Sequence, residues 1–373
     1  MSTMARGPSP LTLSLGVVAL LGLMRVSSCA PKPPHAKSDE ATTTTTATTL
    51  ATTTTMTTAS AAACDGKGVL RAHFYDVAQG LAVLIDLPDG RRIMVDAGDS
   101  ATRAGCEGVC AKSEEHLLAT LKRDVGTSPI DGLWITHPHS DHEGGASALL
   151  DAFSVRWLAD NGRDLTKPVP EHAHKAATRH GVAIHAVEPP SFDASFLRGA
   201  WPESILNVRA VVPDRWHPDC REDENECSIG LRIDYCQSSI LIVGDAEKSE
   251  ESRLETFGPA TLLQVGHHGS DTSTSEAFLK RVQPKYAVIS AGRPDEGLNA
   301  TYCHPRASTI DRLDRHLGGK RDGKLRAFDG KTHCKVGLDD HWRDVASSDR
   351  IWATERDGDV VVSTKGDGVF GRE

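Results

Sequence analysis

A run of histidines and an aspartate in the middle of the chain has the residue types and spacing of a metal site. Four potential ligands fall within six residues, namely His137, His139, Asp141 and His142. Along an extended chain, residues two apart share a side, so His137 and His139 can reach one metal ion. A turn into a following helix would then direct Asp141 and His142 toward a second ion. The spacing therefore predicts a two-metal site, and the alternative is a histidine-rich surface loop.

Three further polar clusters also follow predicted strands. Asp245 follows the apolar segment 240–243, and the pair His267-His268 follows the segment 262–265. Adjacent histidines before a glycine are unusual outside ligand sites. Asp96 closes an early hairpin in the same way and offers a carboxylate that could orient a ligand histidine. Polar clusters at four strand ends indicate one shared site.

The pattern of apolar residues predicts the elements that must hold these side chains. Segments with strand character are 69–75, 81–87, 92–95, 131–136, 229–235, 240–243, 262–265, 286–290 and 360–363. Segments with helical character are 113–122, 143–153, 275–282 and 304–317. Ser113 is expected to cap the first helix, because acidic residues follow it in what would be the first turn. The ranges 160–202 and 321–350 lack a clear pattern, and we interpret them as loops or insertions.

Strand groups and helix groups recur twice along the chain, which indicates an α+β fold. That order suits two sheets packed face to face with helices outside, a four-layer αββα sandwich. A plain α+β domain would give much the same order. In either arrangement, the histidine cluster lies where the strand 131–136 ends.

The composition is that of a globular domain with an acidic balance. Hydrophobic residues make up 39% of the chain and aromatic residues 5%, which is too low and dispersed for a protein with several membrane spans. The formal net charge is -9 at pH 7. This charge opposes a general affinity for polyanions, because nonspecific nucleic-acid binding needs clustered Lys and Arg. DNA is therefore a disfavoured partner, although a local basic groove remains compatible with the charge.

The N-terminus has the features of an export signal. Arg6 precedes an apolar run at 11–24, which is too short to span a bilayer and has the length of a signal-peptide core. Residues 26–29 resemble a bacterial lipobox with Cys29 as the lipidated residue, although Arg25 beside it is atypical. Plain secretion and a retained anchor are the alternatives. All three place the folded domain outside the cytosol.

Three parts are expected along the chain: a signal peptide with a lipobox at 1–29, a disordered tether at 30–67 and one folded domain at 68–373. The tether is rich in threonine between 42 and 58, with three prolines before it. Such a segment cannot bury enough apolar surface to offset the entropy lost on ordering. It is expected to act as a solvated spacer between the domain and a membrane.

The cysteine count suggests disulfides. Of nine cysteines, eight remain when Cys29 is set aside for a lipid, and an even count in an exported chain indicates disulfide bonds. Cys106 and Cys110 could close a small loop, as could Cys220 and Cys227. Eight cysteines allow roughly a hundred pairings, so no pairing is assigned. A cysteine zinc site is disfavoured, because the sequence has no C-x-x-C pair.

Several segments together resemble the metallo-β-lactamase-like hydrolase domain of the ComEC-type competence proteins and their free-standing relatives. The similar segments are 74–80 (FYDVAQG), 94–98 (MVDAG), the histidine cluster, 243–245 (VGD), 266–270 (GHHGS) and 287–292 (AVISAG) with His304-Pro305. Their order and spacing extend over roughly residues 68 to 365. The resemblance implies a metallo-β-lactamase-type αββα sandwich and a metal-dependent hydrolase.

The resemblance also implies roles for individual residues. The first ion would be bound by His137 and His139, the second by Asp141, His142 and His268, with Asp245 bridging both. Asp141, His267 and His304 are the expected catalytic residues, and the two histidines would line the pocket. The implied cofactor is a pair of Zn²⁺ ions, with Mn²⁺ as the alternative.

Two departures from the family pattern bear on the site. Where the wider fold offers a third histidine to the first ion, this chain has Asn225, and His217 is the nearest substitute. Where relatives often have Gly-Gln-Gly-Asp, this chain has Ala78-Gln79-Gly80-Leu81, which removes one acid near the pocket. The first metal site is therefore expected to be weaker than usual.

The implied chemistry is hydrolysis by water activated on two cations, without a side-chain nucleophile. Ser270 has no G-x-S-x-G context and is expected to contact substrate or cap a helix. We expect a phosphodiesterase or nuclease-like enzyme acting on a small-molecule or phosphodiester substrate. The alternatives are a lactone or β-lactam hydrolase and a non-catalytic envelope binding protein with a decayed metal site. The sequence leaves the oligomeric state open.

Overall fold

The computed structural model describes Cys64 and residues 68–294, 296–330 and 341–373. The chain divides into two units, 1–54 and 55–373, and the described residues all belong to the second unit. The expected signal peptide, Cys29 and nearly all of the expected tether lie outside the described residues. Among the described residues, no helix is both long and apolar enough to cross a membrane.

The first sheet has eight strands in the order β16-β15-β1-β2-β3-β4-β5-β6. Their bounds are β1 Leu70–Phe74, β2 Val83–Asp86, β3 Arg92–Val95, β4 Ile130–Trp134, β5 Val155–Asp160, β6 Ala183–Ala186, β15 Val360–Thr364 and β16 Gly371–Arg372. The expected meander is present, because β1, β2 and β3 pair antiparallel. From β3 to β6 the pairing is parallel. Parallel strands need a crossover on one face, and helices supply it here.

The second sheet has six strands in the order β14-β11-β10-β9-β8-β7. Their bounds are β7 Leu206–Val211, β8 Gly230–Tyr235, β9 Ser238–Ile242, β10 Leu262–Gln264, β11 Tyr286–Ile289 and β14 Ile351–Ala353. Strands β7, β8 and β9 are antiparallel, and β9, β10, β11 and β14 are parallel. Each sheet thus joins an antiparallel part to a parallel part.

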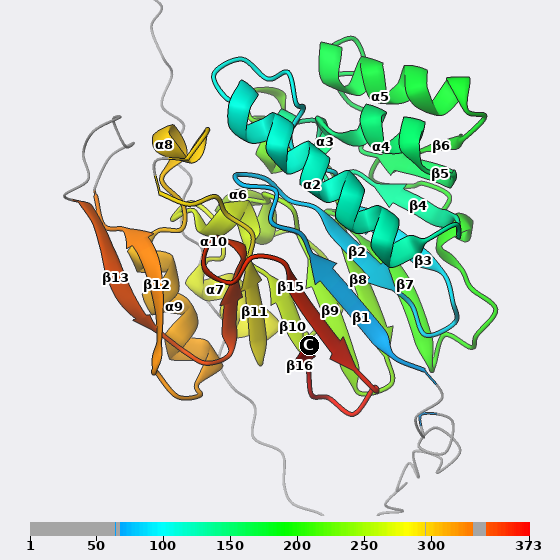
Figure 1. Cartoon of the computed structure of the whole chain (residues 1–373). Coiled ribbons are helices and arrows are strands. Elements are labelled where there is room, and N and C mark those ends of the chain that lie inside the picture. Colours follow the sequence, from blue (N-terminus) through cyan, green and yellow to red (C-terminus); the bar gives the residue numbers. More distant parts are fainter. Residues whose placement is uncertain (1–63, 65–67, 295, 331–340) are drawn as a thin grey trace, which may run out of the picture. The chain divides into compact units, whose positions relative to one another are not determined.

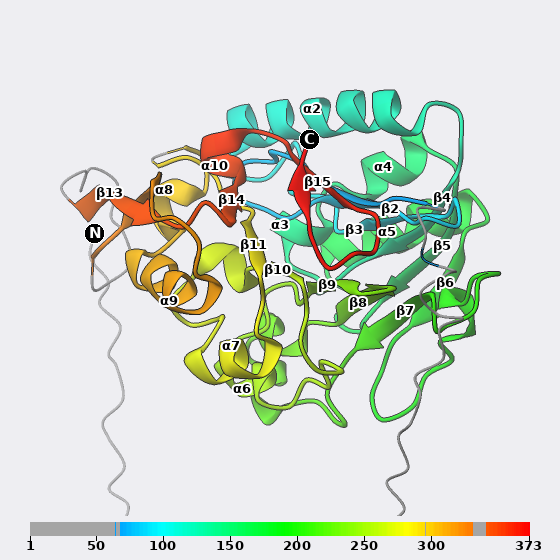
Figure 2. The same ribbon diagram turned by 90° about the horizontal axis from the view of Figure 1, so that it is seen from below.

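Helices cover the outer faces of both sheets (Figure 1). On the first sheet these are α2 Glu107–Val125, α4 Ala146–Ala152 and α5 Pro168–Arg179; on the second they are α6 Lys248–Glu251, α7 Glu276–Val282 and α9 Ala307–Leu317. Single-turn helices connect the layers: α3 Ser140–Glu143, α8 Asn299–Tyr302 and α10 Thr354–Asp357. Figure 2 shows α2 and α4 on one side of the two sheets and α7 and α9 on the other.

Three buried apolar clusters correspond to the three boundaries between these layers. The cluster between the sheets includes Phe74 and Trp134 from the first sheet and Leu231 and Ile242 from the second, all fully buried. Separate clusters lie between each sheet and its helices. Because both faces are covered, strands such as β4 and β9 are buried along their whole length rather than alternating between buried and exposed residues. The predicted α+β, four-layer αββα sandwich is confirmed.

Two expectations about local structure were wrong. Helix α2 begins at Glu107 after the N-cap residue Cys106, so Ser113 lies inside the helix instead of capping it. The ranges 160–202 and 321–350 are not simply loops. The first contains α5 and β6, and the second contains the hairpin of β12 Gly323–Phe328 and β13 Trp342–Ser347.

Disulfides join several of the cysteines. The pairs are Cys64–Cys236, Cys106–Cys110 and Cys220–Cys227, and Cys303 is also disulfide-bonded. The two short loops that the sequence suggested are therefore closed. Cys64–Cys236 joins residues 172 positions apart and fastens the start of the domain to the turn between β8 and β9.

Candidate metal centre

The expected ligands meet where strands of both sheets end. Strand β4 leads through Thr136 into His137, His139 and α3, which carries Asp141 and His142. Strand β9 ends just before Gly244-Asp245, and β10 leads into a short 3₁₀ turn, Gly266–Gly269, that carries His267 and His268. Carboxyl ends of parallel strands share one edge, so residues far apart in sequence converge there.

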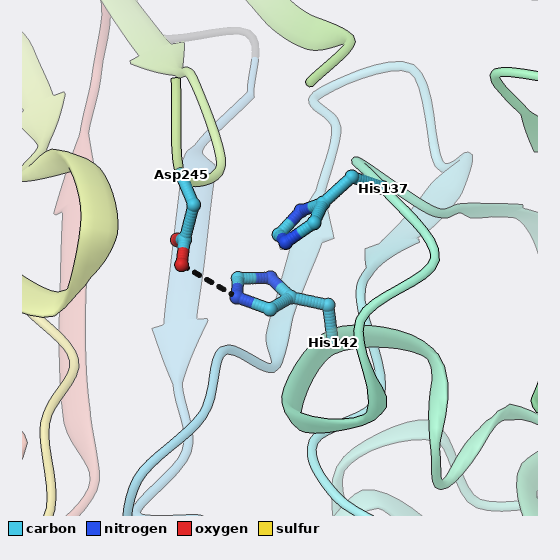
Figure 3. A group of neighbouring side chains, drawn as sticks. All are labelled: His137, His142 and Asp245. Carbon is cyan, nitrogen blue, oxygen red and sulfur yellow. Dashed lines mark ion pairs between the residues drawn. The ribbon is translucent and has the colours of Figure 1, made fainter. Parts of the chain in front are cut away.

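The donor atoms form two overlapping groups. One group comprises His137, His142 and Asp245, and the other comprises Asp141, His142 and His268; the donor atoms of each group lie within 4.8 Å of one another. Figure 3 shows His137 and His142 facing Asp245 from across the site. Within these groups, only Asp141 is more than about a tenth exposed as a whole residue, and His137 and His142 are fully buried.

Asp96 orients His142. Its Oδ2 lies 2.7 Å from Nδ1 of His142 and accepts a hydrogen bond from the Thr136 hydroxyl, while its Oδ1 accepts from the Thr136 backbone N–H. A carboxylate can only accept, so Nδ1 of His142 carries a proton. In the neutral ring, Nε2 then presents its lone pair to the centre of the site. This agrees with the orienting role expected for Asp96.

His268 is held in the corresponding way by a backbone carbonyl. Its Nδ1 lies 2.8 Å from the carbonyl oxygen of Ser290, so Nδ1 donates. The Nε2 atoms of His142 and His268 then face each other at 3.2 Å, and each lies 3.2 to 3.3 Å from Oδ2 of Asp245. If both rings were neutral, the lone pairs of the two Nε2 atoms and of Asp245 Oδ2 would point at one another. Only positive charge at this centre, from protons or from a metal ion, relieves that repulsion.

The pKa directions divide the histidines into two pairs. Burial disfavours charge on His268, but the carboxylates of Asp245 and Asp141 outweigh it and raise the pKa of His268 to about 9. The pKa of His142 is also raised, against burial, by Asp245 and Asp96. Burial lowers the pKa of His137, with His142 and His139 acting in the same direction, and burial also lowers the pKa of His139. Without a metal ion, the carboxylates therefore favour protonated rings at His142 and His268, while burial favours neutral rings at His137 and His139.

Metal binding is expected to release these protons. His268 is charged in the metal-free protein below pH about 9, and a ligand histidine must be neutral at its coordinating nitrogen, so about two protons should leave at pH 7. Because the pKa of His268 is raised on folding, its protonation stabilises the folded protein without metal. This contribution to the free energy of unfolding is complete below pH 6.5, the usual histidine pKa, and is lost as pH rises through about 9. Calorimetric titration with Zn²⁺ in buffers of different ionisation enthalpy measures the release. A release near zero at pH 7 would contradict this assignment.

Asp245 gives the strongest indication that a positive charge belongs at the centre of the site. Its Oδ1 is buried and has no hydrogen-bond partner among the described residues. The carboxylate remains ionised although burial opposes its charge, because His142, His268 and His267 hold the pKa of Asp245 well below its usual value. Gly244 allows this placement, since it has a φ of 58° and an added Cβ would lie 2.6 Å from the Thr136 side chain.

The first expected metal site has fewer donors than the second. Nε2 of His137 lies 3.0 Å from Nδ1 of His139, and His139 also faces Glu224 at 3.4 Å. Asn225 lines the same cavity, with its Oδ1 buried and without a partner in the described part of the chain. The His217 side chain instead accepts a hydrogen bond from the Asp219 backbone N–H and caps a short 3₁₀ turn, and His217 does not line the cavity. Of the two substitutes considered from sequence, Asn225 is the one that lies at the site.

The cavity over the donors has a volume of about 370 Å³. His267 and His304 both line it, as expected. Gly292 N–H donates to Oε1 of Gln79 at 3.4 Å, which leaves the Gln79 amide to donate to Nδ1 of His304, also at 3.4 Å. Burial lowers the pKa of His304, with His267 and His268 acting in the same direction. Burial therefore favours a neutral His304, and the Gln79 contact favours the tautomer with its proton on Nε2.

Six residues that line this cavity lie outside the motifs singled out from sequence: Arg103, Glu247, Asp271, Thr272, Tyr302 and Arg306. Glu247 pairs with Nδ1 of His267 at 3.1 Å. The others belong to no recognisable chemical motif, and Tyr302 among them ends the single-turn helix α8. A larger hollow of about 490 Å³ lies along β7 and includes none of the expected ligands, so its size does not make it the reactive site.

Comparison with known proteins agrees with this geometry. The sequence model of the metallo-beta-lactamase superfamily matches residues 75–293. ComE operon protein 3 of Bacillus subtilis is 30% identical over 252 residues, and Recombination protein 2 of Haemophilus influenzae is 31% identical over 243 residues. Each alignment covers 65% of this chain but only 30% and 26% of those relatives, so the chain spans less than a third of their length.

A solved structure of the CmlA beta-hydroxylase is similar with a TM-score of 0.41 and 14% identity, covering 67% of this chain and 50% of that one. The family model covers more than half of the present chain. This chain belongs to the metallo-beta-lactamase superfamily, and the resemblance to the ComEC-type competence proteins is confirmed.

Proposed function

We propose that this protein is a two-metal hydrolase that cleaves phosphodiesters. The observation that carries the proposal is the meeting of two donor groups that share His142, with Asp245 in the first group and its Oδ2 3.3 Å from Nε2 of His268 in the second. The Oδ1 atom of Asp245 is buried without a partner in the described residues. Imidazole and carboxylate donors suit Zn²⁺ and Mn²⁺. The proposed ligands are His137 and His139 for one ion, Asp141, His142 and His268 for the other, and Asp245 for both.

Two bound cations would activate a water molecule and polarise the scissile group. The chain's own residues supply orientation and protons. Asp96 and the Ser290 carbonyl hold the rings of His142 and His268 in one tautomer and one direction. His304 presents an Nε2–H to the cavity, which can donate to an oxygen of the substrate or to the leaving group. Asp141 and His267 adjoin the same space.

A substrate panel tests this function. The metal-loaded protein should hydrolyse an activated phosphodiester such as bis(p-nitrophenyl) phosphate, and chelation should remove that activity. Hydrolysis of a lactone or a β-lactam with no phosphodiester turnover would assign the other branch of the family. Metal binding without turnover of any substrate would support a non-catalytic binding protein, for which Asn225 in place of a third histidine is the supporting feature.

We also propose that the domain at 68–373 is exported and tethered. The apolar run at 11–24, Cys29 in a lipobox-like segment and the threonine-rich stretch support the proposal. The disulfides agree with an oxidising compartment. Cys29→Ala should move the protein from the membrane fraction to the soluble fraction, and unchanged fractionation would count against the anchor. Eight free thiols in denatured protein from its native envelope would contradict export.

A further inference from the structure

The cavity over the metal centre is polar on every side. Each residue that lines it carries a polar or charged side chain. Four of these are carboxylates: Asp141, Asp245, Glu247 and Asp271. An anion entering the cavity would be repelled by them unless positive charge lay on more than one side. A polar lining of this kind suits a charged substrate better than an apolar ester.

Positive charge is present on the wall formed by Arg103, Tyr302 and Arg306. Arg103 lies in the loop before α2, three residues ahead of the Cys106–Cys110 disulfide. One Nη of Arg103 pairs with Asp99 at 3.4 Å, and the other donates to the Tyr302 hydroxyl at 3.5 Å. The Arg103 side chain is 26% exposed, so it can still meet a ligand in the cavity.

Arg306 supports the other end of Tyr302. Its Nη2 donates to the Tyr302 carbonyl oxygen at 3.3 Å, and its guanidinium lies 4.9 Å from the centre of the Phe328 ring. Arg306 is only 7% exposed, whereas Tyr302 is 38% exposed. Two guanidinium groups therefore approach one tyrosine from its two ends. Because the Tyr302 hydroxyl accepts from Arg103, its own proton is available to donate to a bound group.

We propose that Arg103 and Tyr302 bind the anionic oxygens of the substrate, with Arg306 fixing Tyr302 in place. An arginine fork and a hydroxyl donor match phosphoryl oxygens. This inference rests on the proposed hydrolase function and narrows its substrate to one that carries a negative charge beside the scissile bond. Neutral esters and lactones would gain nothing from this wall.

Phosphate binding tests the proposal without requiring turnover. Inorganic phosphate is titrated by calorimetry into the metal-loaded protein and into Arg103→Ala, Arg103→Lys and Tyr302→Phe. We expect Arg103→Ala to weaken phosphate binding about tenfold or more at unchanged metal content, since it removes charged hydrogen bonds. Arg103→Lys should be intermediate, because it keeps the charge and loses the fork. Arg123→Ala is the matched control, as Arg123 lies on α2, does not line the cavity and is 72% exposed.

Kinetics on a charged and a neutral substrate distinguish a loss of specificity for anions from a general loss of activity. Arg103→Ala should raise KM for bis(p-nitrophenyl) phosphate by a larger factor than it changes KM for p-nitrophenyl acetate. Wild-type protein that does not bind phosphate, or phosphate affinity that is equal in Arg103→Ala and wild type, would overturn the proposal, as would equal losses on both substrates. Phosphate binding that depends on Arg103 in a protein that cleaves no phosphodiester would refute the proposed phosphodiesterase function and leave this binding site intact.

Discussion

Asp245→Ala is expected to abolish activity and to remove metal at the same time. The Asp245 carboxylate lies 3.2 to 3.3 Å from Nε2 of both His142 and His268, so its loss removes negative charge from both donor groups. It would also leave the raised-pKa histidines without their main counter-charge. We expect bound metal to fall from about two ions to below about one per chain. Elemental analysis of the purified protein and a phosphodiester assay measure the two effects.

Two matched variants separate this result from general damage. His304→Ala should lose activity and keep its metal, because His304 lines the cavity without belonging to either donor group. Asp271→Ala removes a cavity carboxylate outside both donor groups and should also keep its metal. Metal loss in His304→Ala would make His304 a ligand. Full activity in Asp245→Ala would overturn the two-metal mechanism.

Asp96→Ala is expected to have the largest combined effect on stability and metal affinity. The Asp96 carboxylate is fully buried and accepts from the Thr136 N–H, the Thr136 hydroxyl and His142. Truncation leaves these buried donors unpaired, which costs about 3 to 5 kcal/mol. Loss of the group that orients a ligand histidine also weakens metal binding about 10-fold to 100-fold. Asp96→Asn keeps the shape and should show the loss of affinity with a smaller loss of stability.

Asp131 provides the control for Asp96. Asp131 lies on β4 of the same sheet, is 8% exposed, and accepts from the Arg92 backbone N–H and the Arg156 side chain. Asp131→Ala should lower the free energy of unfolding and leave metal affinity unchanged. Chemical denaturation and competition with a metal chelator measure the two quantities. Wild-type metal affinity in a folded Asp96→Asn protein would contradict the orienting role.

The sequence predicted the site best where several candidate metal ligands fall within one short segment. His137, His139, Asp141 and His142 fall within six residues, and Asp245 follows an apolar strand directly. Strand ends could be read because buried strands have continuous apolar runs. Their convergence then followed from the edge that parallel strands share. The layered fold was predictable for the same reason, since strand and helix groups recur in order.

The parts that were missed have weak or misleading local signals. Helix α5 begins with Pro168-Val169-Pro170, which resembles a loop, although proline is well tolerated in the first turn of a helix. Strand β6 is mostly exposed and has no apolar alternation. Strand β12 alternates charged with buried residues only over a short span. The helical period of α5 is carried by small residues, since the buried positions after Pro170 are Ala173, Ala176 and Ala177, and it is therefore a weak signal.

Arg103 and Tyr302 were missed for a different reason. Arg103 lies in the loop before α2 and Tyr302 ends the single-turn helix α8, and the two are adjacent only in three dimensions, 199 positions apart in sequence. Cysteines lie close to both in sequence, at Cys106 and Cys303, and both cysteines are disulfide-bonded. The even cysteine count suggested such crosslinks, but which loops they hold beside the site depends on tertiary structure. Single functional residues on separate segments form no motif, so the sequence does not show that they share a site.

The most direct test of the two-metal account is reconstitution of the metal-free protein. Chelated protein is titrated with Zn²⁺ or Mn²⁺ while bound metal and bis(p-nitrophenyl) phosphate hydrolysis are followed together. We predict no hydrolysis without metal and full activity only when about two ions are bound per chain. Hydrolysis by metal-free protein, or full activity at one ion per chain, would contradict the account.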